Sequence, residues 1–150
     1  MMKPIQFIEK QAFLLGGFHA GAEQPGVNHW EKFESQTAKE DLRNLVDDTG
    51  FEVRFYPETR ENIFTGVRVK SADGQPSYEF LTVPAALYAV FDINCKKKLD
   101  SQFGGIDKWL DKNRAAFPRR QWDGADYIVC CYGRMAKERV FEMWIPVTKA

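Results

Sequence analysis

The sequence predicts an α+β fold made of two consecutive βαββ units. In each half of the chain, the pattern of apolar residues indicates a strand, a helix and two further strands. Trp30 and Trp109 lie 79 residues apart on the two expected helices, and Val53 and Val129 lie 76 residues apart on two expected strands. A nearly constant offset of this kind is typical of an internal duplication. We therefore expect one antiparallel sheet, or two abutting sheets, with two main helices on one side, pseudo-twofold symmetry and a ligand cleft at the seam.

The first half begins with two short apolar segments, 4–8 and 11–15, which have strand character and which the glycine pair at 16–17 is expected to close. A loop then leads into a helical pattern, which Gly50 is expected to end. Helical spacing relates six apolar residues of this segment: Val27, Trp30, Phe33, Leu42, Leu45 and Val46.

Residues 51–56 alternate with period two, and Pro57 starts the connection to 63–69, so these two segments predict a hairpin. The second half then begins with strand character over 78–91, interrupted at 84–86 by Pro-Ala-Ala. This order repeats the start of the first half.

The glycine pair at 104–105 is expected to open the second helix, and Pro118 is expected to stop it. Residues 127–132 and 139–145 predict a second hairpin, with Gly133 at the start of its turn. The inward-facing residues expected on this helix are Ile106, Trp109, Leu110 and Ala116.

Length and charge limit the classes of function. The 150 residues fit one domain, 1–150, with the two units at about 3–77 and 78–150. The 21 Lys and Arg balance 21 Asp and Glu, which disfavours nucleic-acid binding because the attraction to phosphate is missing. No apolar run is long enough for a membrane span, and no signal peptide precedes the first strand, so we expect a cytoplasmic protein without a membrane partner.

Cysteines and aromatic residues limit the kind of site. Three cysteines, without a CxxC or Cys/His cluster, indicate reduced thiols, no metal site and no cofactor. His19 and His29 have no partner residue at a spacing that predicts catalysis. The 12 Phe, 5 Tyr and 4 Trp exceed the usual need of a small core, and this surplus favours an aromatic-lined cavity.

The second half also carries a family signature. The run at 78–91, followed by Gly-Ile-Asp-Lys-Trp-Leu at 105–110 and Met-Trp-Ile-Pro-Val at 143–147, resembles the GyrI-like small-molecule-binding domain. That domain is the effector-binding domain of AraC-type and MerR-type regulators, and it also occurs as free-standing proteins, including integron-associated ones. In the first half, 55–57 and 64–69 are similar to the family's aromatic pair and following G-V-x-V segment. The resemblance covers essentially the whole chain. It implies a duplicated βαββ fold whose seam binds amphipathic, often cationic, aromatic compounds.

One position departs from the family pattern. Members commonly place a carboxylate in a strand written aromatic-Glu-x-Tyr, where the buried acid meets a positive charge of the ligand. The corresponding strand here ends in Cys130, Cys131 and Tyr132, which places the thiol of Cys130 at the acidic position. Strand alternation puts Cys130 and Tyr132 on one face and Cys131 on the other, so the two thiols should point apart. Glu142, on the same face as Trp144, is then the nearest substitute anion.

The candidate ligand-binding residues combine aromatic surface with a polar atom. Tyr132 and Trp144 are the first candidates, because adjoining strands should place both at the seam and each has a polar tip. For the helical Trp30 and Trp109, a role in the core competes with a role in binding. The complete set is Tyr132, Trp144, Cys130, Glu142, Tyr56, Tyr88, Trp109 and Trp30.

These observations predict a free-standing protein that binds a small amphipathic ligand and has no DNA-binding segment of its own, because the two units account for the whole chain. The resemblance leaves two alternatives. Some relatives are thought to hydrolyse strained electrophilic natural products, for which Glu142, Tyr132 or a nucleophilic Cys130 could serve, although no catalytic residue is assigned. The family's name also suggests an inhibitor of a DNA topoisomerase, a role that the balanced charge does not favour. A regulator or a topoisomerase is accordingly a possible protein partner.

Overall fold

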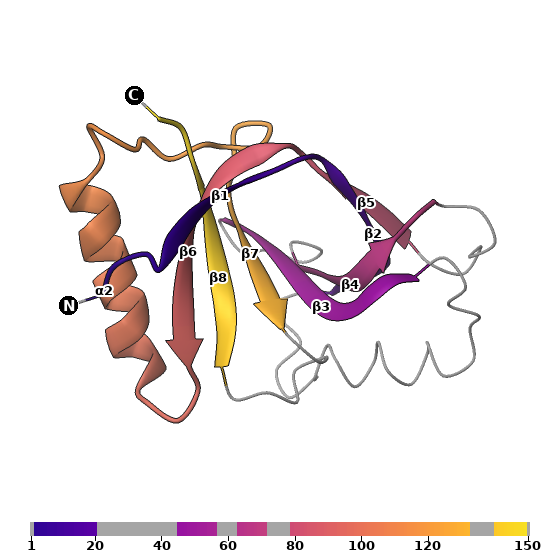
Figure 1. The fold of residues 1–150 in the computed structure, drawn as a ribbon, viewed down its shortest axis with the longest axis horizontal. Helices are drawn as coiled ribbons and strands as arrows, with labels where there is room; N and C mark the ends of the chain where they lie inside the picture. The colour runs from indigo at the N-terminus through magenta and orange to yellow at the C-terminus, as the bar shows by residue number, and fades with distance from the viewer. Residues whose placement is uncertain (1, 21–44, 57–62, 72–78, 133–139, 150) are drawn as a thin grey trace.

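The computed structural model describes residues 2–20, 45–56, 63–71, 79–132 and 140–149, and Figure 1 shows their arrangement. The strands of this part of the chain form one antiparallel sheet, in the order β1-β6-β8-β7-β3-β4-β2-β5, and one helix, α2, lies beside it. The fold is therefore α+β with an antiparallel sheet, as the sequence predicted. The elements are β1 (Gln6–Lys10), β2 (Phe13–Ala20), β3 (Leu45–Tyr56), β4 (Ile63–Val69), β5 (Glu79–Val83), β6 (Ala86–Asn94), α2 (Leu99–Lys112), β7 (Asp126–Tyr132) and β8 (Val140–Val147).

The strand order has the form that two equivalent units would produce. If each of β1 to β4 is equivalent to the strand four numbers later, β5 to β8, the strand order reads the same from either edge of the sheet. The two halves meet where β3 pairs with β7, and Val53 lies directly opposite Val129 in that pairing. Most of the first expected helix lies outside the described residues, so the pseudo-twofold relation of the complete units stays a prediction.

The sheet curls so that its two ends approach each other. Only two residues separate β1 from β2, yet these strands are first and seventh in the sheet, and Figure 1 shows the chain arching over the other strands between them. The inner face, on the concave side of this curl, encloses a core that includes Leu15, Val53, Tyr88 and Val129, all fully buried. The outer face of β6, β7 and β8 carries a second core, which α2 covers through the buried Ile106. Any cavity between α2 and the sheet therefore lies on the outer face.

The glycine pair at 16–17 lies within β2 and does not end it. The strand continues to Ala20 because it pairs with β4 on one side and β5 on the other. Gly17 lies opposite Gly66, and a Cβ atom on Gly17 would overlap the carbonyl oxygen of Thr65. These glycines are needed for the close approach of two strands, and the prediction that the pair ends the strand was wrong.

The helix boundaries also differ from those expected. β3 begins at Leu45, so Leu45 and Val46 belong to a strand and Gly50 lies inside it. The earlier residues of that helical pattern, including Trp30, lie outside the described residues.

The second helix, α2, begins at Leu99, before the glycine pair at 104–105, and it ends at Lys112, before Pro118. The side-chain amide of Gln102 holds its first turns to the end of β6, since Gln102 Oε1 accepts from the Asn94 N–H and Nε2 donates to the Asn94 carbonyl. At the other end, Asn113 donates both its backbone N–H and its side-chain Nδ2 to the carbonyl of Trp109. Among the described residues, no helix is long and apolar enough to cross a membrane.

Candidate ligand-binding site

A cavity of about 730 Å³ lies between α2 and the outer face of β3, β7 and β8. We call it the central cavity, because β3 and β7 are the two central strands of the sheet. Its volume falls within the range of about 300–1,000 Å³ that small-molecule sites occupy. Its apolar lining comes from three elements: Leu99, Phe103, Ile106 and Leu110 of α2, Ile128, Cys130 and Tyr132 of β7, and Phe141, Met143 and Ile145 of β8.

Strand alternation explains why these residues share a wall. In the pairing of β7 with β8, Cys130 lies opposite Met143 and Tyr132 lies opposite Phe141. Paired residues of neighbouring strands point to the same face, and so does every second residue along each strand. The wall is therefore built from alternate positions of two strands and faces the apolar side of α2.

A buried carboxylate stands beside this wall, and sequence analysis did not identify it. Glu52 is 4% exposed and lies opposite Cys130 in the pairing of β3 with β7. Nε of Arg54, two residues further along the strand, donates to Oε1 of Glu52 at 2.9 Å. Burial by itself would lower the pKa of Arg54, but the charge of Glu52 and this hydrogen bond outweigh burial and raise it. The Arg54 guanidinium therefore stays charged at neutral pH, directly beside the Glu52 carboxyl group.

The groups around Glu52 are held in their neutral forms. Burial, followed by the charge of Glu52, raises the pKa of the Cys130 thiol to about 12. Burial also raises the pKa of Tyr132, and electrostatic interactions with Cys130 and Glu52 and a hydrogen bond to Glu52 add to this shift. A protonated Cys130 agrees with the expectation that this position carries no charge, and a thiol in this form is a poor nucleophile.

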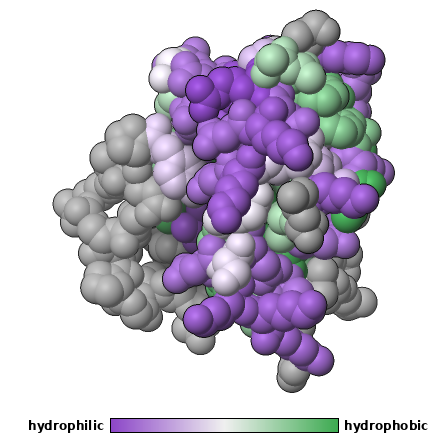
Figure 2. Space-filling view, turned by 90° about the vertical axis from the view of Figure 1, so that its left-hand side faces the viewer, coloured by the Kyte–Doolittle hydropathy of each residue, from purple (hydrophilic) through white to green (hydrophobic). Residues whose placement is uncertain are grey.

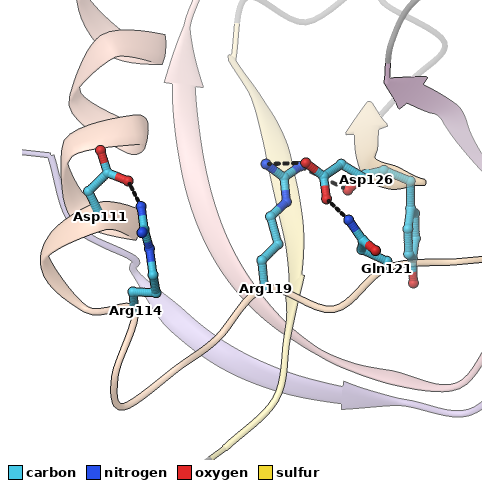
Figure 3. Close-up of polar contacts among 6 residues, drawn as sticks. Asp111, Arg114, Arg119, Gln121 and Asp126 are labelled. Atoms are coloured by element: carbon cyan, nitrogen blue, oxygen red, sulfur yellow. Dashed lines mark hydrogen bonds and ion pairs between the residues drawn. The ribbon is translucent and has the colours of Figure 1, made fainter. Parts of the chain in front are cut away.

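A second set of charged side chains, drawn in Figure 3, borders the central cavity near the start of β7. Gln121 Nε2 donates to Asp126 Oδ1 at 3.0 Å, and Arg119 Nη1 lies 3.9 Å from Asp126 Oδ2. The Nη2 of Arg119 donates to the carbonyl of Tyr127 at 3.3 Å, and its Nε is buried without a hydrogen-bond partner among the described residues. Both Arg119 and Asp126 also line an adjoining hollow of about 480 Å³, at whose other end Asp111 pairs with Arg114.

A larger hollow, of about 870 Å³, lies on the other side of α2, and we call it the outer hollow. Four lysines line it, Lys97, Lys98, Lys108 and Lys112, together with Trp109 and several polar residues. Figure 2, which looks onto this side of the molecule, shows a mainly hydrophilic surface. The central cavity is the better candidate for an amphipathic ligand, because most of its lining residues are apolar or aromatic and because the buried Glu52 pairs with Arg54 at its wall.

The structure brings three of the predicted site residues together. Tyr132, Cys130 and Tyr56 all line the central cavity, and Cys131 lies on the opposite face, packed against the inner core. The two adjacent thiols therefore point apart, as expected. Trp109 lies on the other side of α2, where its ring is 5.7 Å from that of Phe91.

The remaining predicted residues lie elsewhere. Tyr88 is fully buried in the inner core, where its hydroxyl lies 3.3 Å from that of Tyr127. Burial raises the pKa of both hydroxyls. Trp144 also belongs to the inner core at 5% exposure, and its Nε1 donates to Oε1 of Glu142 at 3.0 Å. Trp30 lies outside the described residues.

The expectation that Trp144 and Tyr132 share one wall was wrong. Trp144 lies opposite Val129, whereas Tyr132 lies opposite Phe141, so the two rings are on opposite faces of the sheet. Glu142 is on the face of Trp144 and lies opposite Cys131, so it cannot supply a charge on the face of Cys130. The sequence correctly predicted which side chains of each strand point to the same side. It did not predict how β7 pairs with β8, and this pairing decides which side chains of the two strands share one face of the sheet.

The signal for Glu52 was present in the sequence. The period-two pattern of 51–56 already places Glu52, Arg54 and Tyr56 on one face of a strand. A Glu and an Arg at alternate positions are usually a solvated pair, because charged residues are rarely buried. The pairing of β3 with β7, which joins residues far apart in the chain, is what brings this face to the cavity.

No protein-family description and no curated protein sequence matches the chain. Among solved structures, the chain is similar to SAV2435 bound to tetraphenylphosphonium, with a TM-score of 0.66, 16% identity and coverage of 95% of this chain and 93% of the other.

Two further similar structures come from one protein. The C-terminal domain of EcmrR matches with a TM-score of 0.60, 11% identity and coverage of 97% of both chains. EcmrR in complex with DNA matches with a TM-score of 0.64 and 11% identity over 97% of this chain and 57% of that chain. At these identities the comparisons establish the fold, which agrees with the one that the sequence resemblance implied. The chain therefore has the α+β fold of SAV2435 and of the C-terminal domain of EcmrR.

Proposed function

We propose that this protein binds a small amphipathic organic compound in the central cavity. The observation that carries this proposal is the cavity itself: about 730 Å³, mainly apolar, and bounded by α2 on one side and by β3, β7 and β8 on the other. A ligand with aromatic rings would be stabilised by burial against Phe103, Phe141 and Met143. Tyr132 and Tyr56 would add ring surface and a hydroxyl that can orient the ligand.

The structural neighbours support this proposal. One was solved with tetraphenylphosphonium, a compact aromatic compound, and another is the C-terminal domain of a protein that also forms a complex with DNA. We extend the proposal to a ligand-sensing role in the bacterial cytoplasm, in association with a regulator. The neutral Cys130 thiol gives no support to a hydrolase that uses this residue as a nucleophile.

Two substitutions on α2 test the location of the site. Leu110 is half-buried and lines the central cavity, whereas the exposed Lys108 lines the outer hollow. Leu110→Trp should fill part of the central cavity and weaken binding of triphenylphosphine oxide, an uncharged aromatic probe, by about tenfold or more, equivalent to about 1.4 kcal/mol. Lys108→Trp, the matched control, should leave this affinity within about threefold of wild type.

The measurement is isothermal titration of the two variants and wild type, after thermal melts have shown that each is folded. Loss of binding in Lys108→Trp with full binding in Leu110→Trp would place the ligand in the outer hollow and contradict the proposal.

A further inference from the structure

The Glu52 carboxylate already has a cation beside it. Arg54 Nε donates to Glu52 Oε1 at 2.9 Å, and Arg54 is on the same strand, two residues away. Its side chain is 32% exposed and lines the central cavity, whereas the side chain of Glu52 is 6% exposed and is not part of the lining. A ligand that enters the cavity therefore meets the guanidinium before it reaches the carboxylate.

This order of groups changes what a buried acid does for selectivity. A buried carboxylate without a counterion favours a cationic ligand, because the ligand's charge offsets the cost of removing the carboxylate from water. When an arginine already provides that charge, a cationic ligand must displace the arginine or be repelled by it. The other charges of the lining are Arg119, Asp107 and Asp126, which together contribute one more negative charge than positive. Along β7, Asp126 lies opposite Tyr56, four residues from Cys130, the partner of Glu52. Near Glu52, the charge presented to a ligand is that of Arg54.

We infer that Arg54 is the residue that determines charge selectivity in this cavity, and that it makes the site select uncharged or anionic aromatic compounds over organic cations. This inference rests on the proposed function and specifies the ligand class of the same site. Arg54 acts as a permanent internal counterion of Glu52, so Arg54 occupies the place that a ligand cation would take.

Three probes with similar aromatic bodies separate charge from shape: triphenylphosphine oxide is neutral, tetraphenylphosphonium is cationic and tetraphenylborate is anionic. Each probe is compared with itself across variants, so differences in its general hydrophobicity cancel. Arg54→Gln should strengthen tetraphenylphosphonium binding by about tenfold or more, because it removes the guanidinium that stands between the ligand and Glu52 and that repels a cation. The same substitution should change triphenylphosphine oxide binding by less than about threefold.

Two further variants act as controls. Glu52→Gln removes the carboxylate while Arg54 keeps its charge and its partly exposed position, and it should strengthen tetraphenylborate binding by about tenfold. This variant keeps the inference testable if Arg54→Gln does not fold. In the double variant Glu52→Gln/Arg54→Gln, the gain for tetraphenylphosphonium should disappear, since the gain depends on the carboxylate.

The outcomes distinguish this inference from the proposed function. If triphenylphosphine oxide binds wild type but neither single variant changes the affinity for its charged probe, the inference about Arg54 is overturned and the proposed function stands. If none of the three probes binds wild type or any variant, the proposed function and the inference both fail. A gain for tetraphenylphosphonium in Arg54→Gln that is lost in the double variant would support both.

Discussion

Trp144→Leu should mainly lower the stability of the protein, whereas Tyr132→Leu should mainly weaken ligand binding. Trp144 is 5% exposed, with its ring 5.8 Å from that of Phe51 and 5.6 Å from that of Tyr88. Truncation leaves unfilled space in the inner core and removes the hydrogen bond to Glu142, at a combined cost of about 2–4 kcal/mol. For a chain of this length, that cost lowers the melting temperature by about 4–16 °C.

Binding should respond in the opposite way. Trp144 is on the inner face of the sheet, so Trp144→Leu should leave the affinity for triphenylphosphine oxide within about threefold of wild type. Tyr132 is half-buried and lines the central cavity, so Tyr132→Leu should weaken binding by about tenfold, with a smaller drop in melting temperature. Thermal melts and calorimetric titrations of both variants provide the comparison. A Trp144→Leu protein that melts like wild type but no longer binds would refute the assignment of this ring to the core.

Three predictions concern the fold. Gly104→Ala should stabilise α2 by about 0.5–1 kcal/mol, because the added Cβ would meet no atom. Gly105→Ala should stabilise the protein less, or destabilise it, because its Cβ would lie 2.7 Å from Cβ of Met2. Thermal melts of the two variants test this difference. Gly17→Ala should lower the yield of folded protein or its melting temperature sharply, as measured by circular dichroism, and a melt unchanged from wild type would contradict the close strand approach. The pKa of Cys130 rises on folding from 9.0 to about 12, so the folded protein should lose stability as the pH rises through this range. Denaturant titrations at several pH values should show a smaller loss of stability for Cys130→Ala than for wild type. An identical pH profile for the two proteins would argue against the shift.

Local patterns predicted the strands of this fold well. The segments 51–56, 63–69 and 127–132 were expected as strands, and each lies within one, because period-two alternation reports directly on a half-buried extended chain. Glycine was a weaker guide. The pair at 16–17 was expected to end a strand and the pair at 104–105 to open a helix, yet both lie inside their elements. Glycine permits a turn, but it also permits close packing, and only tertiary structure shows which of the two applies.

The site was predictable in part. Alternation placed Cys130 and Tyr132 on one face correctly, because this depends on neighbours in sequence alone. It could not show that Met143 rather than Trp144 shares that face, because a shift of one residue in the pairing of two strands moves every side chain of one strand to the other face of the sheet. Glu52 was missed for the same reason, since its burial depends on pairing with β7.

The most direct test of the central claim is a crystal structure of the protein with triphenylphosphine oxide. We expect the rings of the probe to lie between α2 and strands β7 and β8, in contact with Tyr132 and Met143, with the ion pair of Glu52 and Arg54 intact beside them. A probe bound in the outer hollow next to Trp109, with the central cavity unoccupied, would contradict the claim that the central cavity is the ligand-binding site.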